Sequence, residues 1–167
     1  MTFPAARSSR RASSARAPVL ALLLFSAVAV GCGLPFHAAT PPGFVELPEP
    51  KQYDYRATTA DGVVIAVRAI EHEPQGELGF WVTAIQQEVR ERKGYALLES
   101  RDVKTGQGLT GKQLRFGYDE GKKPHLYYVT LLLTKANLFL IEAGGQKERM
   151  TQHAAGIDSV VQSFEAK

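Results

Sequence analysis

The chain has 167 residues, with 20 lysines and arginines against 17 aspartates and glutamates, which gives a formal net charge of +3. Four of the arginines (Arg7, Arg10, Arg11 and Arg16) lie within residues 1–31, a segment without any acidic residue. Without that segment, 16 basic residues stand against 17 acidic ones, a net charge of −1, and the basic surface that nucleic-acid binding requires is missing. The single cysteine, Cys32, excludes a disulfide within the chain, so a packed core must provide the stability.

The N-terminal segment has the pattern of a secretory signal peptide. An arginine-rich start is followed by the uncharged stretch VLALLLFSAVAV at residues 19–30, and then by Gly31 and Cys32. This stretch would rise about 18 Å as a helix, whereas a transmembrane helix needs about 20 residues. We therefore expect residues 1–31 to be a processing signal and not a permanent membrane span.

Residues 29–32, Ala-Val-Gly-Cys, resemble the lipobox of bacterial lipoproteins, although the lipobox prefers leucine at the position of Ala29. The resemblance implies cleavage between Gly31 and Cys32 and lipidation of Cys32. A diacylated cysteine anchors a protein stably to the lipid bilayer, because two acyl chains are buried. The alternative is an ordinary signal peptide with an incidental cysteine.

These features predict a cell-envelope protein that faces the periplasm or the exterior. Similar lipoproteins of Gram-negative bacteria that stay in the inner membrane carry aspartate after the cysteine. Gly33 stands there instead, which favours the outer membrane if the organism has one. Ser9-Arg10-Arg11 resembles part of a twin-arginine signal, so both Sec and Tat export stay open.

Five prolines fall within residues 33–50, and we expect a Pro-rich tether over residues 32–42. Such a tether would hold the domain up to about 30 Å from the membrane, with Phe36 and His37 in solvent. Residues 43–167 then have the usual length of one domain.

The sequence of the first part of this domain predicts three strands and a helix. Residues 43–48, 53–59 and 63–71 are strand-like, and Asp61-Gly62 indicates a hairpin with a type I′ turn. Residues 77–94 predict a helix that ends at Gly94. Its apolar face comprises Leu78, Trp81, Val82, Ile85 and Val89. Trp81 is expected in the core and not in a ligand platform.

The second part predicts four strands and a closing helix. The strands are residues 95–103, 112–120, 125–135 and 138–143, and the third does not alternate, so it should lie centrally with both faces covered. The short link at 135–137 requires its two strands to be antiparallel. Within 112–118, Leu114, Phe116 and Tyr118 alternate with Gln113 and Arg115, which indicates a half-buried strand.

The closing helix has an apolar face made of Met150, Ala154, Ile157, Val161 and Phe164. Gly156 within it is expected to allow a close approach to the sheet. Two amphipathic helices and a central non-alternating strand predict an α+β fold, an α/β/α sandwich with a central antiparallel sheet and a helix on each side.

The order of elements, with DGVVIAVRAIE in the second hairpin strand and IDSVVQSFE at the end, resembles the PsbP-like α/β/α sandwich of small bacterial lipoproteins over residues 43–165. The resemblance implies a non-enzymatic binder or assembly factor. It is a likeness of fold, which does not by itself determine function.

No metal or cofactor site is indicated. His37, His72, His125 and His153 have no ligand spacing, and Glu71-His72-Glu73 is expected to be a solvated turn at the end of a strand. The loop KTGQGLTGK at 104–112 resembles a phosphate loop, but Gln113 replaces the required hydroxyl residue and a strand follows. We expect an ordinary flexible loop there.

The sequence shows no hydrolase motif, and Asp119-Glu120 is expected to be solvated at the tip of a hairpin. The polar loops at 99–108 and 119–125 are interpreted as ordinary connections, with binding as the alternative. We therefore expect a non-enzymatic binding or assembly module for an envelope protein. The alternatives are a small-ligand-binding lipoprotein and an enzyme without a recognisable motif.

Overall fold

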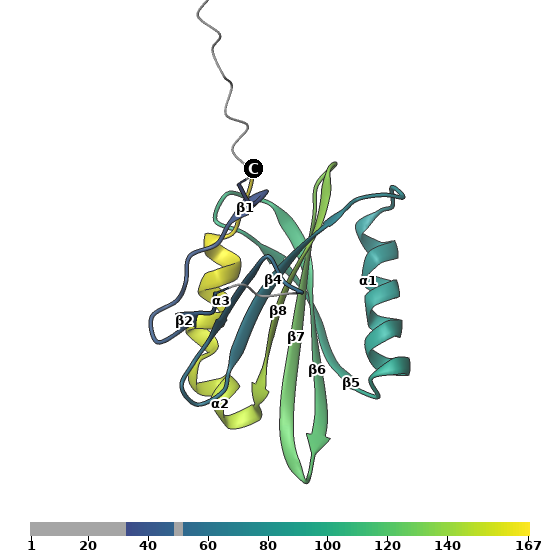
Figure 1. The fold of residues 1–167 in the computed structure, drawn as a ribbon. Coiled ribbons are helices and arrows are strands. Elements are labelled where there is room, and N and C mark those ends of the chain that lie inside the picture. Colours follow the sequence, from purple (N-terminus) through teal and green to yellow (C-terminus); the bar gives the residue numbers. More distant parts are fainter. Residues whose placement is uncertain (1–32, 49–51) are drawn as a thin grey trace, which may run out of the picture. The chain divides into compact units, whose positions relative to one another are not determined.

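The computed structural model describes residues 33–48 and 52–167 (Figure 1). The expected signal peptide, its cleavage site at Gly31 and the lipidation site Cys32 lie outside these residues. Within the described part of the chain, no helix has the length and apolar character needed to cross a membrane.

The core of the fold is a seven-stranded antiparallel sheet with the strand order β2-β3-β4-β8-β7-β6-β5. The strands are β2 (Val45–Glu46), β3 (Tyr55–Thr58), β4 (Val64–Glu71), β5 (Ala96–Lys104), β6 (Thr110–Glu120), β7 (Lys123–Leu133) and β8 (Asn137–Gln146). Separately, β1 (Phe36–His37) pairs with β9 (Glu165–Ala166).

Helices lie on both faces of the sheet, as Figure 1 shows. Helix α1 (Leu78–Gln87) continues into the wider π-helical turn η1 (Glu88–Arg92) and packs on one face. Helices α2 (Lys147–Gln152) and α3 (Ala154–Ser163) pack on the other. The expected α/β/α sandwich is confirmed.

Each face of the sheet has its own hydrophobic core. The core under α1 contains the predicted apolar face of that helix, including Trp81, together with alternate residues of β6, β7 and β8. The core under α2 and α3 is larger and contains the other alternate residues, such as Ile65, Phe139 and Ile141. A period of two along each strand divides the apolar residues between the two cores.

The strand β7 is central and is buried on both faces from Val129 to Leu132, as predicted. It pairs antiparallel with β8 across the short link. The strand β6 buries Leu114 and Phe116 as expected, but Gln113 on the other face is also buried. Its side-chain oxygen accepts hydrogen bonds from Arg101 Nε at 2.9 Å and Arg115 Nε at 2.8 Å, which replace water.

The hairpin predicted at Asp61-Gly62 joins β3 and β4, which pair from Thr58 and Val64 onward. The turn is longer than expected, because residues 59–63 connect the strands and only Gly62 has a positive φ, +91°. A type I′ turn needs two positive φ angles, so that expectation is wrong.

The solvated tether predicted over residues 32–42 is wrong for Phe36. Its side chain is only 3% exposed, stacks on Phe164 at 5.5 Å between ring centroids and meets the edge of Phe139 at 6.0 Å. The backbone of Phe36 pairs with Ala166 in β9. The Pro-rich segment is therefore partly built into the domain.

The closing helix also differs from the expectation. It is interrupted at His153, and Ala154 is exposed, whereas Met150, Ile157, Val161 and Phe164 are buried as predicted. A Cβ at Gly156 would lie 3.2 Å from Phe44 and 3.3 Å from Pro41. Gly156 therefore admits the N-terminal segment and not the sheet.

Candidate functional site

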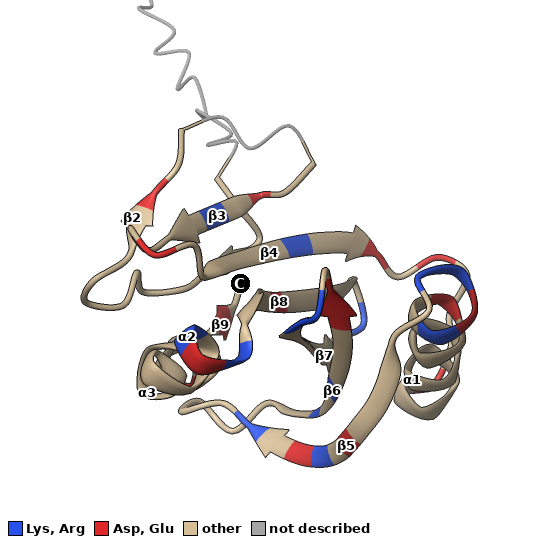
Figure 2. Cartoon of the chain, turned by 90° about the horizontal axis from the view of Figure 1, so that it is seen from below, with Lys and Arg blue, Asp and Glu red and all other residues tan. Residues whose placement is uncertain are grey.

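The face of the sheet that carries α1 is only partly covered by it. The helix packs against β6 and β7, and the same face of β3, β4 and β8 lies beside it (Figure 2). A cavity of about 470 Å³ opens on this part of the face. Because side chains alternate along strands, Glu142, Gly144 and Gln146 of β8 all line it.

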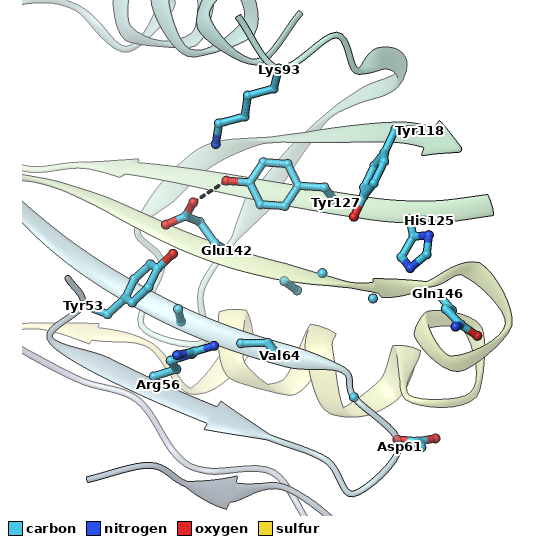
Figure 3. Close-up of a pocket in the computed structure, with 15 residues that line it drawn as sticks. Tyr53, Arg56, Asp61, Val64, Lys93, Tyr118, His125, Tyr127, Glu142 and Gln146 are labelled. Carbon is cyan, nitrogen blue, oxygen red and sulfur yellow. Dashed lines mark hydrogen bonds between the residues drawn. The ribbon is translucent and has the colours of Figure 1, made fainter. Parts of the chain in front are cut away.

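The other walls come from segments far apart in the sequence. Tyr53 and Arg56 line one side, and Val64 and Ala66 of β4 lie next to them. Tyr118 of β6 and His125 and Tyr127 of β7 line the opposite side, while Lys93 follows η1 at the end of the helix. Figure 3 shows Lys93 reaching toward Tyr127 and Glu142 from the helix side, with Tyr53 and Arg56 across the cavity.

A hydrogen-bonded cluster lies in the centre of the cavity wall. The Tyr127 hydroxyl donates to Glu142 Oε1, and Arg68 Nε donates to Glu142 Oε2 at 2.8 Å. Glu142 is only 6% exposed, so its charge depends on these partners. Burial, followed by the negative charge of Glu142, raises the pKa of Tyr127 well above its ordinary value.

An aromatic stack forms the end of the cavity near the β6–β7 hairpin. Tyr95 and Tyr118 are nearly parallel with ring centroids 4.1 Å apart, and His125 stacks on Tyr118 at 5.1 Å. Tyr127 meets the edge of Tyr95 at 5.8 Å. Burial, followed by the neighbouring Tyr95, raises the pKa of Tyr118 to about 12. Burial in the stack therefore favours the protonated hydroxyl of Tyr118 over the phenolate.

Two cations line the cavity, and neither has a carboxylate partner within the part of the chain that the structure describes. Lys93 Nζ lies 5.2 Å from the centroid of the Tyr127 ring, and the Arg56 guanidinium lies 5.9 Å from that of Tyr53. None of the ion pairs among residues 33–48 and 52–167 includes either side chain. Arg56 Nε is buried and has no hydrogen-bond partner in this part of the chain.

The far rim of the cavity carries a second acidic group, Asp61, whose charge is engaged. His153 Nε2 lies 3.1 Å from Asp61 Oδ1, and Arg149 Nη1 lies 3.7 Å from Oδ2. The Thr59 hydroxyl also donates to Asp61. The hydrogen bond from Thr59, followed by that from His153, lowers the pKa of Asp61.

The candidate residues noted in the sequence are not brought together into a chemical centre. His72 is 5% exposed and not solvated as expected; its Nδ1 bonds the Thr134 carbonyl at 3.0 Å and its Nε2 accepts from Gly76 N–H at 2.9 Å. These hydrogen bonds hold the connection between β4 and α1 against the turn that follows β7. Among the described residues, no group of three His, Cys, Asp or Glu side chains is arranged to hold a metal ion.

The polar segments at 99–108 and 119–125 are shorter as loops than expected, because β5 extends to Lys104 and β7 begins at Lys123, and His125 lines the cavity. The loop after β5 docks on α3, where Gly106 N–H donates to the Gln162 carbonyl at 2.8 Å. The polar segment at 119–125 is a tight hairpin around Gly121 and Lys122, both with positive φ, and Asp119 and Glu120 are exposed there as expected.

The cavity could not be predicted from the sequence. Its walls come from five strands, the segments before β3 and between β3 and β4, and the residue after η1, so no local motif marks it. One usable signal was present: Gly144 and Gly145 interrupt the apolar strand β8, and a glycine inside a strand often marks a close approach or an open space.

Comparison with known proteins places the fold. No protein-family model matches the sequence, and no significant match is found among curated proteins. Solved structures do match. LpqN, described as involved in cell envelope biogenesis of Mycobacterium tuberculosis, has a TM-score of 0.58 at 12% identity, over 77% of this chain and 81% of that one. Cyanobacterial PsbP (CyanoP) from Synechocystis has a TM-score of 0.52 at 14% identity, over 82% and 96%.

The protein Mog1 is similar in the same way, with a TM-score of 0.52 at 14% identity, over 79% of this chain and 90% of that one. Identities this low show a shared fold. The chain therefore has a PsbP/Mog1-like fold, which confirms the resemblance stated from the sequence.

Proposed function

We propose that the protein is a non-enzymatic binding module of the cell envelope, and that it binds an envelope protein at the cavity beside α1. The observation that carries this proposal is the cavity itself, which combines aromatic rings, an opening to solvent and two cations that form no ion pair with any residue of 33–48 or 52–167. Aromatic and arginine side chains contribute most to binding energy at protein interfaces.

The envelope location is supported by two independent features. The sequence ahead of the domain resembles a lipoprotein signal that ends at Cys32. The solved structures of similar fold include LpqN, which is described as involved in cell envelope biogenesis. We propose that Cys32 is acylated and holds the domain at a bilayer, in the outer membrane if the organism is Gram-negative.

The structure changes the expected distance of the domain from that bilayer. Because β1 begins at Phe36, only residues 33–35 separate the anchor from the first strand. The four Cα–Cα steps from Cys32 to Phe36 span at most about 14 Å when fully extended, compared with the expected 30 Å or so. An acylated Cys32 would therefore keep the domain close to the membrane surface, where it meets partners that are themselves embedded there.

A small-ligand-binding lipoprotein is the second candidate, and the cavity volume favours it. About 470 Å³ falls within the usual 300–1,000 Å³ or so of small-molecule sites. A small ligand that binds only the folded state raises the melting temperature with its concentration, whereas a protein partner should be captured as a complex.

The test is photocrosslinking in intact cells of the source organism. A photocrosslinking amino acid replaces Val64 in the cavity or, as a matched control, Glu148 on the exposed surface of α2 on the opposite side of the sheet. We expect one defined envelope protein to be captured from position 64 and not from position 148. Equal capture from both positions, or none from position 64, would contradict a protein partner at the cavity.

Mass spectrometry of the same preparations tests the anchor. We expect the N-terminal peptide to begin at Cys32 and to carry acyl chains, and Cys32→Ala to leave the protein without them. An unmodified Cys32 in the mature protein would show that the protein is released and not anchored.

A further inference from the structure

We infer that the cavity beside α1 recognises a carboxylate group, held between Lys93 and Arg56, with the attached apolar or planar body against the tyrosines. The inference rests on the proposed function, in that it takes the cavity as the binding site. It adds the chemical group that the partner must present.

The charges of the cavity favour a monoanion. Glu142 is already bound by Arg68 and Tyr127, and Asp61 by His153 and Thr59, so both carboxylates are engaged. Lys93 and Arg56 are left without an acidic partner among the described residues, on opposite sides of one opening (Figure 3). Both cations attract an anion that enters the opening, while the nearby Glu142 and Asp61 disfavour a dianion such as phosphate.

The surroundings of Arg56 favour pairing with such an anion. Its Nε is buried and has no hydrogen-bond partner within residues 33–48 and 52–167, and a buried donor without a partner costs free energy. The centroid of the Tyr53 ring lies 5.9 Å from the Arg56 guanidinium and 5.7 Å from that of Arg68, within the range of a cation–π contact. The planar guanidinium matches the two oxygens of a carboxylate.

The floor of the cavity is hollow because residue 144 is glycine. Gly144 has no positive φ, and a Cβ there would make only ordinary contacts, at 3.6 Å to Tyr127 and 3.7 Å to the Leu126 carbonyl. Neither backbone conformation nor crowding therefore requires glycine at this position. The missing side chain leaves room between Glu142 and Gln146, next to the half-buried rings of the tyrosines, for the body that carries the carboxylate.

Two sources could present this group: a small organic acid, or an acidic side chain of the partner protein. The shared chemistry is tested first with the full chain purified in detergent. Benzoate is titrated against its neutral isostere benzamide and against inorganic phosphate. Binding is followed by NMR, from the backbone amide of Gly144 and from the Arg56 Nε–H signal, which burial protects from exchange with water.

We expect benzoate to bind at least about 10-fold more tightly than benzamide or phosphate, the lower range of a charge-assisted hydrogen bond. Lys93→Gln and Arg56→Gln should each remove most of that preference. Lys93 is exposed, so its replacement leaves the core intact. Lys135→Gln, which removes the same charge from the turn between β7 and β8, should leave binding unchanged. Gly144→Leu should block all probes, while Gly144→Ala should not.

Equal binding of benzoate and benzamide, tighter binding of phosphate, or no binding of any probe would overturn the inference. Capped Ala-Glu-Ala and Ala-Gln-Ala peptides then separate the two sources, since a preference for the glutamate peptide supports a protein side chain and its absence supports a small acid. If photocrosslinking at position 64 captures a partner at full yield in the Lys93→Gln, Arg56→Gln double variant, the proposed function stands and the carboxylate inference fails.

Discussion

The packing of Phe36 joins the beginning and the end of the domain. Its ring stacks on Phe164 and contacts Phe139, so it joins the first described segment, β8 and the end of α3 in one cluster. Truncation would leave a cavity that these rings cannot fill without losing their packing. We expect Phe36→Ala to lower the free energy of unfolding by about 3–5 kcal/mol, measured by denaturant titration.

Leu34→Ala is the matched control, because this apolar side chain lies two residues earlier and is 44% exposed. It should change the free energy of unfolding by less than about 1 kcal/mol. Similar losses in the two variants would mean that Phe36 contributes no more than an exposed residue, and that the segment behaves as the tether first expected.

Among the elements, the β3–β4 hairpin is fastened to the junction of α2 and α3 through Asp61 and His153. The lowered pKa of Asp61 means that the folded state prefers its carboxylate more than the unfolded state does. The resulting stabilisation is present above the ordinary pKa of 3.8 and is lost as the pH falls through the lowered value.

We therefore expect the melting temperature of the wild type to fall more steeply than that of Asp61→Asn as the pH drops below about 4. Calorimetric scans over a pH series measure this directly. Asp119→Asn, at the exposed tip of the β6–β7 hairpin, should follow the wild type. Parallel curves for the wild type and Asp61→Asn would show that the contact contributes nothing to folding.

The elements differ in how far the sequence predicts them. The alternation of Leu114 and Phe116 and the apolar run in β7 are local patterns, and the sheet follows from them. The pairing of β1 with β9 has no such pattern, because two-residue strands show no periodicity and their partners lie at opposite ends of the domain. The burial of His72 could not be predicted for a similar reason, because its hydrogen-bond partner Thr134 is distant in the sequence.

The cavity arises because helices cover the two faces of the sheet to different extents. Seven strands about 4.8 Å apart make a sheet roughly 29 Å wide, whereas one helix is only about 10–12 Å across. On one side the sheet curls around α2 and α3, which helps to close that core (Figure 2). On the other side α1 covers β6 and β7, and one helix cannot reach β3 and β4 as well. Polar and aromatic side chains therefore occupy the uncovered part.

The stability of the whole molecule depends on pH in the alkaline range, because burial on both faces of the sheet raises the pKa of tyrosines. The pKa of Tyr118 is raised to about 12 and those of Tyr127 and Tyr55 are raised as well, compared with 10.0 in the unfolded chain. The folded state keeps protons that the unfolded state releases, so the stability present below pH 10.0 is lost as the pH rises through the raised values.

We expect Tyr127→Phe to be less stable at neutral pH by about 1–3 kcal/mol, because Glu142 loses a hydrogen bond in a buried position. Above pH 10 or so, however, its stability should fall less steeply than that of the wild type, by a slope approaching about 1.4 kcal/mol per pH unit. Denaturant titrations across this range, with tyrosinate absorbance recorded on the folded protein, measure both effects. Equal slopes for the two proteins would show that Tyr127 ionises as readily in the folded state as in the unfolded one, and the buried Tyr127–Glu142–Arg68 cluster would then not hold the cavity wall together.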